Sequence, residues 1–254
     1  YELCKILTLN YMLNVNFVNN LCLNFKIRIF MCTVTFLPLS DNGFVLTSSR
    51  DVGYQREKAL APQTYLEDGV YLQYPKDGKA GGTWIGTSRN NRLICLLNGG
   101  FENHVQQKSY AKSRGLIVKE LLIAEDFEEM SMTIDLKRIE PFSLVVVTWK
   151  SESQLWEFVW DGNNRHVKKL PWQPSIWSSS TLYTHDMKSL RQDWFREWFI
   201  GKGMSPENIL DFHKHAGLGF PEVDVFMRRE KVGTVSITQV IESKEKKEMN
   251  YYPV

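Results

Sequence analysis

Residues 31–49 read MCTVTFLPLSDNGFVLTSS, and this stretch decides the fold that the rest of the chain must complete. Polar and apolar residues alternate from Cys32 to Leu37, and the alternation ends at Pro38, as in a strand with one buried face. The turn residues Asp-Asn-Gly at 41–43 lead into a second run of strand-forming residues, Phe44–Ser49. Two such runs joined by a turn of this kind predict a β-hairpin.

Short runs of strand-forming residues recur further along the chain. Trp84–Ser88 and Leu93–Leu97 are separated by polar turn residues, and so are Ser143–Trp149 and Leu155–Trp160, which predicts two more hairpins. Val232–Ile241 is rich in Val, Ile and Thr and predicts a late strand.

Helical patterns are fewer. Leu116–Glu125 and the acidic stretch after it predict two short helices. The clearest helix begins at Thr184, a suitable N-cap, and continues through HDMKSLRQDWFREWF, whose aromatic side chains fall on one face. Hairpins with few helices indicate a single α+β domain built on mostly antiparallel sheet.

The composition of the 254-residue chain is that of a soluble globular protein, since 43% of residues are hydrophobic and 24% are charged. A net charge of +2 without a block of like charges argues against a nucleic-acid partner. No apolar run approaches the roughly 20 residues that a membrane span needs. The four cysteines form no C-x-x-C pair, which favours a reduced, cytoplasmic setting over a disulfide framework.

Residues 1–30 differ in composition from everything that follows. They contain no Gly, Pro, Ala, Ser or Asp, and Asn is scattered among Leu, Ile and Phe, as in translated AT-rich non-coding DNA. The segment lacks the basic start, apolar centre and cleavage site of a signal peptide. We predict that translation begins at Met31, that residues 31–254 form the single domain, and that trimming of Met31 leaves Cys32 at the N-terminus. A genuine N-terminal extension is the alternative.

A terminal Cys32 has a specific chemical meaning. A free α-amine titrates near pH 8, so it can accept the proton of the thiol on its own residue, directly or through one water. A nucleophile paired with its own amine needs no separate histidine.

Two further segments contain candidate site residues. Arg50 and Asp51 follow the second run of the hairpin, where the Asp can orient the amine and the Arg can hold an anion; a surface ion pair is the alternative. Asn98 ends an apolar strand before two glycines, which suits an amide donor to an oxyanion; a simple Asn-Gly turn is the alternative.

Other candidates are weaker. Trp84 follows a glycine-rich turn and is a candidate pocket wall, and Arg228 and Arg229 are candidate ligands of an anionic substrate, with a solvated strand end as the alternative. His213 and His215 lie two apart, which gives them different directions on a helix, and no ligand set completes them. We therefore predict no metal site and no cofactor.

Several of these segments also resemble a known family. MCTVTFLP (31–38), LTSSRD (46–51), GGTWIG (81–86), CLLNGG (95–100), SRG (113–115) and SSSTLY (178–183) are similar to the bacterial members of the NRDE family, which also contains the eukaryotic transport and Golgi organization protein 2. The resemblance extends from Met31 to about Ile241. The family resembles N-terminal nucleophile hydrolases of the penicillin acylase and bile-salt hydrolase type, which implies a four-layer αββα sandwich of two mostly antiparallel sheets.

The resemblance also assigns roles by position. Cys32 matches the nucleophile, Arg50 and Asp51 match the middle of the Asn-Arg-Asp-Glu motif, and Asn98 matches the oxyanion amide. Ser180 falls where relatives have a second Asn. The outer residues of the motif are replaced here by Ser49 and Val52, which leaves the centre of the site intact and changes its rim.

These observations predict an N-terminal-cysteine amidohydrolase or acyltransferase, which acts on an amide, ester or thioester through an acyl-enzyme at Cys32. As an enzyme it would be a hydrolase of C–N bonds other than peptide bonds. The alternative is a non-catalytic carrier or chaperone of an apolar anionic ligand, haem or acyl-CoA-like, because the eukaryotic relatives are linked to haem trafficking and acyl-CoA metabolism. A small-molecule or acyl partner is expected in either case.

Overall fold

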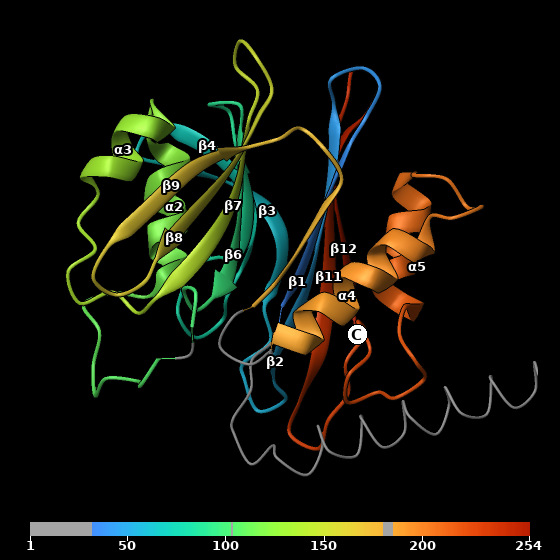
Figure 1. Ribbon diagram of the computed structural model, residues 1–254. Coiled ribbons are helices and arrows are strands. Elements are labelled where there is room, and N and C mark those ends of the chain that lie inside the picture. Colours follow the sequence, from blue (N-terminus) through green and yellow to red (C-terminus); the bar gives the residue numbers. More distant parts are fainter. Residues whose placement is uncertain (1–31, 103, 180–184) are drawn as a thin grey trace, which may run out of the picture.

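The computed structural model describes residues 32–102, 104–179 and 185–254. Within these residues the chain forms two sheets that pack face to face, with helices on the outer side of each (Figure 1). Every pair of neighbouring strands in the two sheets is antiparallel. The predicted α+β class and four-layer αββα arrangement are therefore confirmed.

The five-stranded sheet contains the hairpin that opens the domain. Its strand order is β10-β1-β2-β11-β12, with β1 Thr33–Pro38, β2 Phe44–Gly53, β10 Ser175–Ser178, β11 Val232–Glu242 and β12 Lys247–Pro253. β1 and β2 pair from Thr33 opposite Ser49 to Pro38 opposite Phe44, as predicted. β2 continues to Gly53, beyond the predicted end at Ser49, because β11 pairs with it up to Val232 opposite Gly53.

The seven-stranded sheet is a meander in which each strand lies beside the next one in the sequence. Its strands are β3 Leu60–Glu67, β4 Val70–Lys76, β5 Ile85–Ser88, β6 Arg92–Asn98, β7 Phe142–Thr148, β8 Gln154–Trp160 and β9 Arg165–Leu170. The two predicted hairpins form β5–β6 and β7–β8. Strands β3, β4 and β9 were not predicted.

The helices form the two outer layers. They are α2 Arg114–Ile123, α3 Phe127–Thr133, α4 His185–Trp198 and α5 Pro206–His215. α2 and α3 lie on the seven-stranded sheet, and α4 and α5 lie on the five-stranded sheet (Figure 1). Leu121 and Leu122 of α2 are fully buried, and so are Ile209 and Phe212 of α5, because each helix turns an apolar face to its sheet.

Alternation along β1 and β2 sends neighbouring side chains into two different cores. Val34 and Phe36 belong to the large core between the sheets, and Leu46 of β2 joins them. Leu37 and Val45 belong to the second core, under α4 and α5. Both faces of this strand pair are therefore buried. Alternate residues of each strand face either the core between the sheets or the core under α4 and α5.

Candidate active site

Cys32 directly precedes β1 and lines a cavity of about 620 Å³ between the two sheets. Its side chain is buried, and its carbonyl accepts a hydrogen bond from the backbone N–H of Ser179 at 3.1 Å. Arg50, Trp84 and Asn98 line the same cavity. The structure thus brings together four of the residues that the sequence selected.

Arg50 and Asp51 lie inside β2 and not at a strand end, so their side chains point to opposite faces of the sheet. Arg50 points into the cavity of Cys32. Asp51 points to the outer face, where the hydroxyl of Thr234 on the neighbouring strand β11 donates a hydrogen bond to its Oδ1 at 2.6 Å. The charged pair that the sequence placed beside Cys32 is therefore divided between the two faces of the sheet, because alternation separates consecutive residues. The expectation that Asp51 orients the amine of Cys32 stays a prediction.

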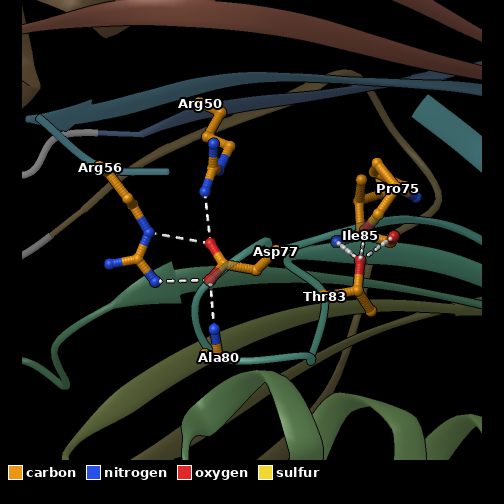
Figure 2. Close-up of polar contacts among 7 residues, drawn as sticks. All are labelled: Arg50, Arg56, Pro75, Asp77, Ala80, Thr83 and Ile85. Carbon is orange, nitrogen blue, oxygen red and sulfur yellow. Dashed lines mark hydrogen bonds and ion pairs between the residues drawn. The ribbon is translucent and has the colours of Figure 1, made fainter. Parts of the chain in front are cut away.

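The guanidinium of Arg50 is held from two sides. Its Nη2 donates to Oδ2 of Asp77 at 2.5 Å, and its Cζ lies 4.1 Å from the centroid of the Trp84 ring. Asp77 also accepts two hydrogen bonds from Arg56, at 2.8 and 2.9 Å (Figure 2). Trp84 therefore forms a wall of the cavity and supports its cation by a cation–π contact.

Asp51 is fully buried on the other face of the sheet. Burial raises the pKa of its carboxyl to about 7, although the Thr234 hydrogen bond and the charges of Arg191 and Arg229 oppose the rise. Its Oδ2 atom is buried and has no hydrogen-bond partner among the described residues. The backbone N–H of Asp51, in contrast, lies close enough to the thiol of Cys32 to lower the pKa of that thiol. Asp51 therefore meets Cys32 through its backbone, whereas its carboxylate lies on the other face with one oxygen that has no partner in the described part of the chain.

The thiol of Cys32 is not activated in the chain as it stands, with a peptide bond before it. Burial and the charge of Asp51 raise its pKa to about 12, outweighing the Asp51 N–H, Arg50 and Arg114, which lower it. Cys95 of β6 is fully buried, and burial raises its pKa to about 12 as well.

Asn98 is the last residue of β6, and its position depends on the glycines that follow. Its carbonyl accepts a hydrogen bond from Ser179 Oγ at 2.8 Å. Gly99 has a φ of 86°, which residues with a side chain rarely adopt. A Cβ on Gly100 would lie 3.0 Å from the backbone of Asp161. The glycines thus let the chain turn sharply at the cavity. Ser180, the remaining candidate from the sequence, lies outside the described residues.

Arg228 and Arg229 do not line the cavity of Cys32. Arg228 is exposed and lines another cavity, of about 660 Å³, beside the end of β12. The Nε of Arg229 donates to the carbonyl of Glu222 at 2.8 Å, and its charge acts on Asp51 from the outer face of the sheet. Their role as substrate ligands stays a prediction, and the structure places both away from the thiol.

Two charged residues near the site, Asp77 and Arg191, were missed in the sequence, and the burial of His213 was not foreseen. Asp77 pairs with Arg50 and Arg56, and its local sequence, a Lys-Asp-Gly turn, gives no indication of this role. Arg191 of α4 is fully buried and donates hydrogen bonds to Thr33 and to the carbonyls of Val223 and Asp224. His213 of α5 lies buried between two hydroxyls of the five-stranded sheet. The polar side of the α4 pattern contained Arg191, and nothing local marked it as buried.

The fold of the described chain resembles that of solved N-terminal nucleophile hydrolases. A Caenorhabditis elegans N-acylethanolamine-hydrolyzing acid amidase ortholog superposes with a TM-score of 0.57 at 11% identity, over 88% of this chain and 100% of that one. A variant of the conjugated bile acid hydrolase from Clostridium perfringens superposes with a TM-score of 0.52 at 9% identity, over 87% and 92% of the chains. The chain therefore shares the fold of these two hydrolases.

The family of the chain is also defined. The sequence model of the family Transport and Golgi organisation 2 matches residues 31–199, and the chain belongs to this family. This agrees with the resemblance to the NRDE family in the sequence. The comparison with curated proteins finds no significant match.

Two features are absent from the described residues. Over residues 32–102, 104–179 and 185–254, no three His, Cys, Asp or Glu side chains gather as a metal site would require. In the same part of the chain, no helix has the length and apolar character needed to cross a bilayer.

Proposed function

We propose that this protein is an N-terminal-cysteine amidohydrolase or acyltransferase that forms an acyl-enzyme at Cys32. The observation that carries the proposal is the convergence of Cys32, Arg50 and Asn98 on one cavity of about 620 Å³. A nucleophile, a cation and an amide residue at the end of a strand are the groups that acyl transfer requires.

The proposal requires Cys32 to be the first residue of the mature chain. The family match begins at residue 31, which supports a start at Met31 and the exclusion of residues 1–30 from the native protein. Asp51 Oδ2, buried without a hydrogen-bond partner among the described residues, supports the same processing. The ammonium that processing would create at Cys32 is a group that this oxygen could accept a hydrogen bond from.

The reaction then follows from the proposed roles. The free amine of Cys32 takes the thiol proton, and the sulfur attacks the carbonyl carbon of an amide, ester or thioester. Asn98 and a backbone N–H stabilise the oxyanion, with the positive charge of Arg50 nearby. The bond to the leaving group breaks as the Cys32 ammonium gives that group its proton. Water, or another acceptor in an acyltransferase, attacks the thioester, and the S–C bond breaks to restore the thiol.

A second function is favoured by the charges of the cavity. Five cations line it, namely Arg50, Arg56, Lys79, Lys112 and Arg114, against two carboxylates, Asp77 and Glu140. This excess favours an anionic ligand. The same cavity would then belong to a carrier of an apolar anionic ligand, haem or acyl-CoA-like, with no catalysis. The free thiols Cys32 and Cys95 support a reduced, cytoplasmic location for either function.

One experiment separates the two functions. A chain that starts at Cys32 and a chain that retains Met31 are each incubated with activated acyl esters, and the intact mass is measured. The enzyme proposal expects an acyl adduct on Cys32 in the first chain, turnover of the ester, and neither in the second. Adduct formation and turnover that are equal in both chains would show that the amine is not the base.

The Cys32→Ser variant of the processed chain is the matched control, and it should lose the thioester adduct. The carrier proposal expects no adduct on Cys32 in either chain. It expects instead saturable binding of haem or of an acyl-CoA, with a Soret band that is lost in Cys32→Ala if the thiolate is the haem ligand.

A further inference from the structure

Asp77 is the first residue after β4, in a tight loop that leads to β5. Its backbone N–H donates to the carbonyl of Gly82 at 2.9 Å, and its Oδ1 accepts from the N–H of Ala80 at 2.8 Å. Thr83 closes the loop, because its hydroxyl lies 2.8 Å from the carbonyl of Pro75 and 2.7 Å from that of Ile85 (Figure 2). Contacts within the loop therefore fix the position of the Asp77 carboxylate independently of the two arginines.

The loop is also fixed from below. A Cβ on Gly82 would lie 2.6 Å from the backbone of Gly115 at the start of α2, and a Cβ on Gly115 would lie 2.8 Å from the backbone of Thr83. The two glycines thus allow a close contact between loop and helix that larger residues would prevent. Because the loop packs tightly on α2, the position of Asp77 is fixed relative to the arginines that contact it.

Two arginines share this one carboxylate. Arg50 approaches Oδ2 at 2.5 Å from the five-stranded sheet, and its side chain is 5% exposed. Arg56 approaches both oxygens, and its side chain is 33% exposed. Burial alone would raise the pKa of Asp77, but the hydrogen bonds from Arg56 and Ala80 and the nearby charges hold it below its usual value. Asp77 is therefore an ionised group that ties the two sheets together at the cavity.

We propose that Asp77 is a positioning residue that holds the guanidinium of Arg50 against Trp84 and beside Cys32, and so acts on the nucleophile through Arg50. Its importance for catalysis rests on the proposed function, but its effect on the thiol does not. The long, flexible side chain of Arg50 has two constraints near its end, the carboxylate of Asp77 and the ring of Trp84. Without the carboxylate, the guanidinium loses its charge partner and its direction.

The sign of the effect distinguishes positioning from simple electrostatics. Asp77 is negative, so its removal would by itself favour the Cys32 thiolate and speed alkylation. If Asp77 acts by holding Arg50 in place, its removal takes the cation away from the sulfur and slows alkylation. The charge of Arg50 already lies close enough to favour the thiolate.

The experiment measures alkylation of Cys32 by iodoacetamide at pH 8, with the modified peptide quantified by mass spectrometry. The wild type is compared with Asp77→Asn, Arg50→Gln and the double variant. We expect each single variant to react about three- to tenfold more slowly, the size of effect of one nearby charge in a partly screened site. We expect the double variant to react no more slowly than Arg50→Gln, because Asp77 has no effect without Arg50.

Arg56→Gln is the matched control, since it also removes an ion pair from Asp77 but leaves Arg50 in place. It should change the rate by less than about twofold. Thermal unfolding confirms that each variant is folded, and Asp77→Glu, which keeps the charge but shifts it, serves if Asp77→Asn does not fold and should also slow alkylation. Unchanged or faster alkylation in Asp77→Asn, or additive losses in the double variant, would overturn the proposal. The rate is measured whether or not Cys32 forms an acyl-enzyme, so this failure is distinct from failure of the proposed function.

Discussion

The two faces of the β1–β2 hairpin differ in what surrounds their polar residues. On the inner face, Cys32 and Arg50 meet a cavity of about 620 Å³. On the outer face, Thr33, Ser49 and Asp51 are fully buried under α4 and α5, where Arg191 and His213 contact them or lie close by. One strand pair thus presents a thiol and a guanidinium to a cavity on one side and a sealed polar layer on the other.

The difference has energetic consequences. Polar groups beside a cavity can exchange partners with water, so the loss of one contact is partly compensated. Polar groups sealed between a sheet and its helices have no such exchange, and each lost partner leaves a buried group unsatisfied. We therefore expect substitutions on the outer face to affect mainly stability, and substitutions on the inner face to affect mainly the chemistry of Cys32.

The largest effect is expected at Arg191. Its buried guanidinium donates hydrogen bonds to the Thr33 hydroxyl and to two backbone carbonyls, and it lies near the carboxylate of Asp51. Arg191→Met should lower the free energy of unfolding by about 3–5 kcal/mol, because buried acceptors and a buried carboxylate lose their cation. Urea unfolding at pH 7.5 measures the change. The same substitution at Arg56 on the inner face, which is one-third exposed, should cost about 1 kcal/mol or less. Equal losses at the two sites would contradict the comparison.

His213 should make the outer face sensitive to acid. Its ring nitrogens lie 2.8 Å from the hydroxyls of Thr35 and Ser49, and burial and the charge of Arg191 lower its pKa from 6.5 to about 3. Between these values the unfolded chain binds a proton that the folded chain does not, so stability is lost as the pH falls below about 6.5.

Between pH 7 and pH 5, the free energy of unfolding of the wild type should fall by roughly 2 kcal/mol because of this group, since only the unfolded chain binds its proton over that interval. Urea unfolding of His213→Gln at both pH values should lack that part of the loss. The same substitution at the exposed His215, on the same helix, should retain it. A His213→Gln variant with the full wild-type loss would show that this histidine is not the acid-sensitive group.

Asp51→Asn should change stability in opposite directions in the two forms of the chain. With a peptide bond before Cys32, the pKa of Asp51 is about 7 against an ordinary 3.8, so the fold holds a proton that the unfolded chain releases. Stability from this group therefore falls as the pH rises from about 4 to 7 and stays low above it. The variant removes this loss and should be more stable at pH 8, on the order of 1–2 kcal/mol.

In a chain that starts at Cys32, the ammonium would give Asp51 a partner, and the same variant should be less stable than its parent by a similar amount. Thermal unfolding of the four proteins at pH 8 measures the reversal. The same sign in both forms would argue that Asp51 does not pair with the amine.

The smallest effect is expected from two adjacent serines of β2. Ser49 lies on the outer face beside His213, and Ser48 lies on the inner face near the thiol of Cys95. Ser49→Ala should cost about 1 kcal/mol, because a buried ring nitrogen loses its partner. Ser48→Ala should change stability by less than about 0.5 kcal/mol. Chemical unfolding of the two variants compares the faces with one and the same substitution.

Part of the site could be predicted and part could not. Cys32, Arg50 and Asn98 were selected because a nucleophile next to a predicted hairpin and an amide at a strand end have local signatures. Asp77 has none, since its partners Arg50 and Arg56 come from another sheet. The separation of Arg50 and Asp51 onto two faces was not foreseen, because β2 was expected to end at Ser49. Its continuation to Gly53 depends on pairing with β11, far along the chain.

The sequence by itself determined the hairpin, the alternation of its residues and the apolar face of α4, because period and turn chemistry are local properties of the chain. Only the tertiary structure decided that alternate residues of one strand pair would meet a cavity on one side and a sealed polar layer on the other. It also decided that a carboxylate of the seven-stranded sheet would hold an arginine of the five-stranded sheet. The physical reason is that burial and charge pairing depend on which surfaces pack together, and the sequence specifies those surfaces only through contacts between distant residues.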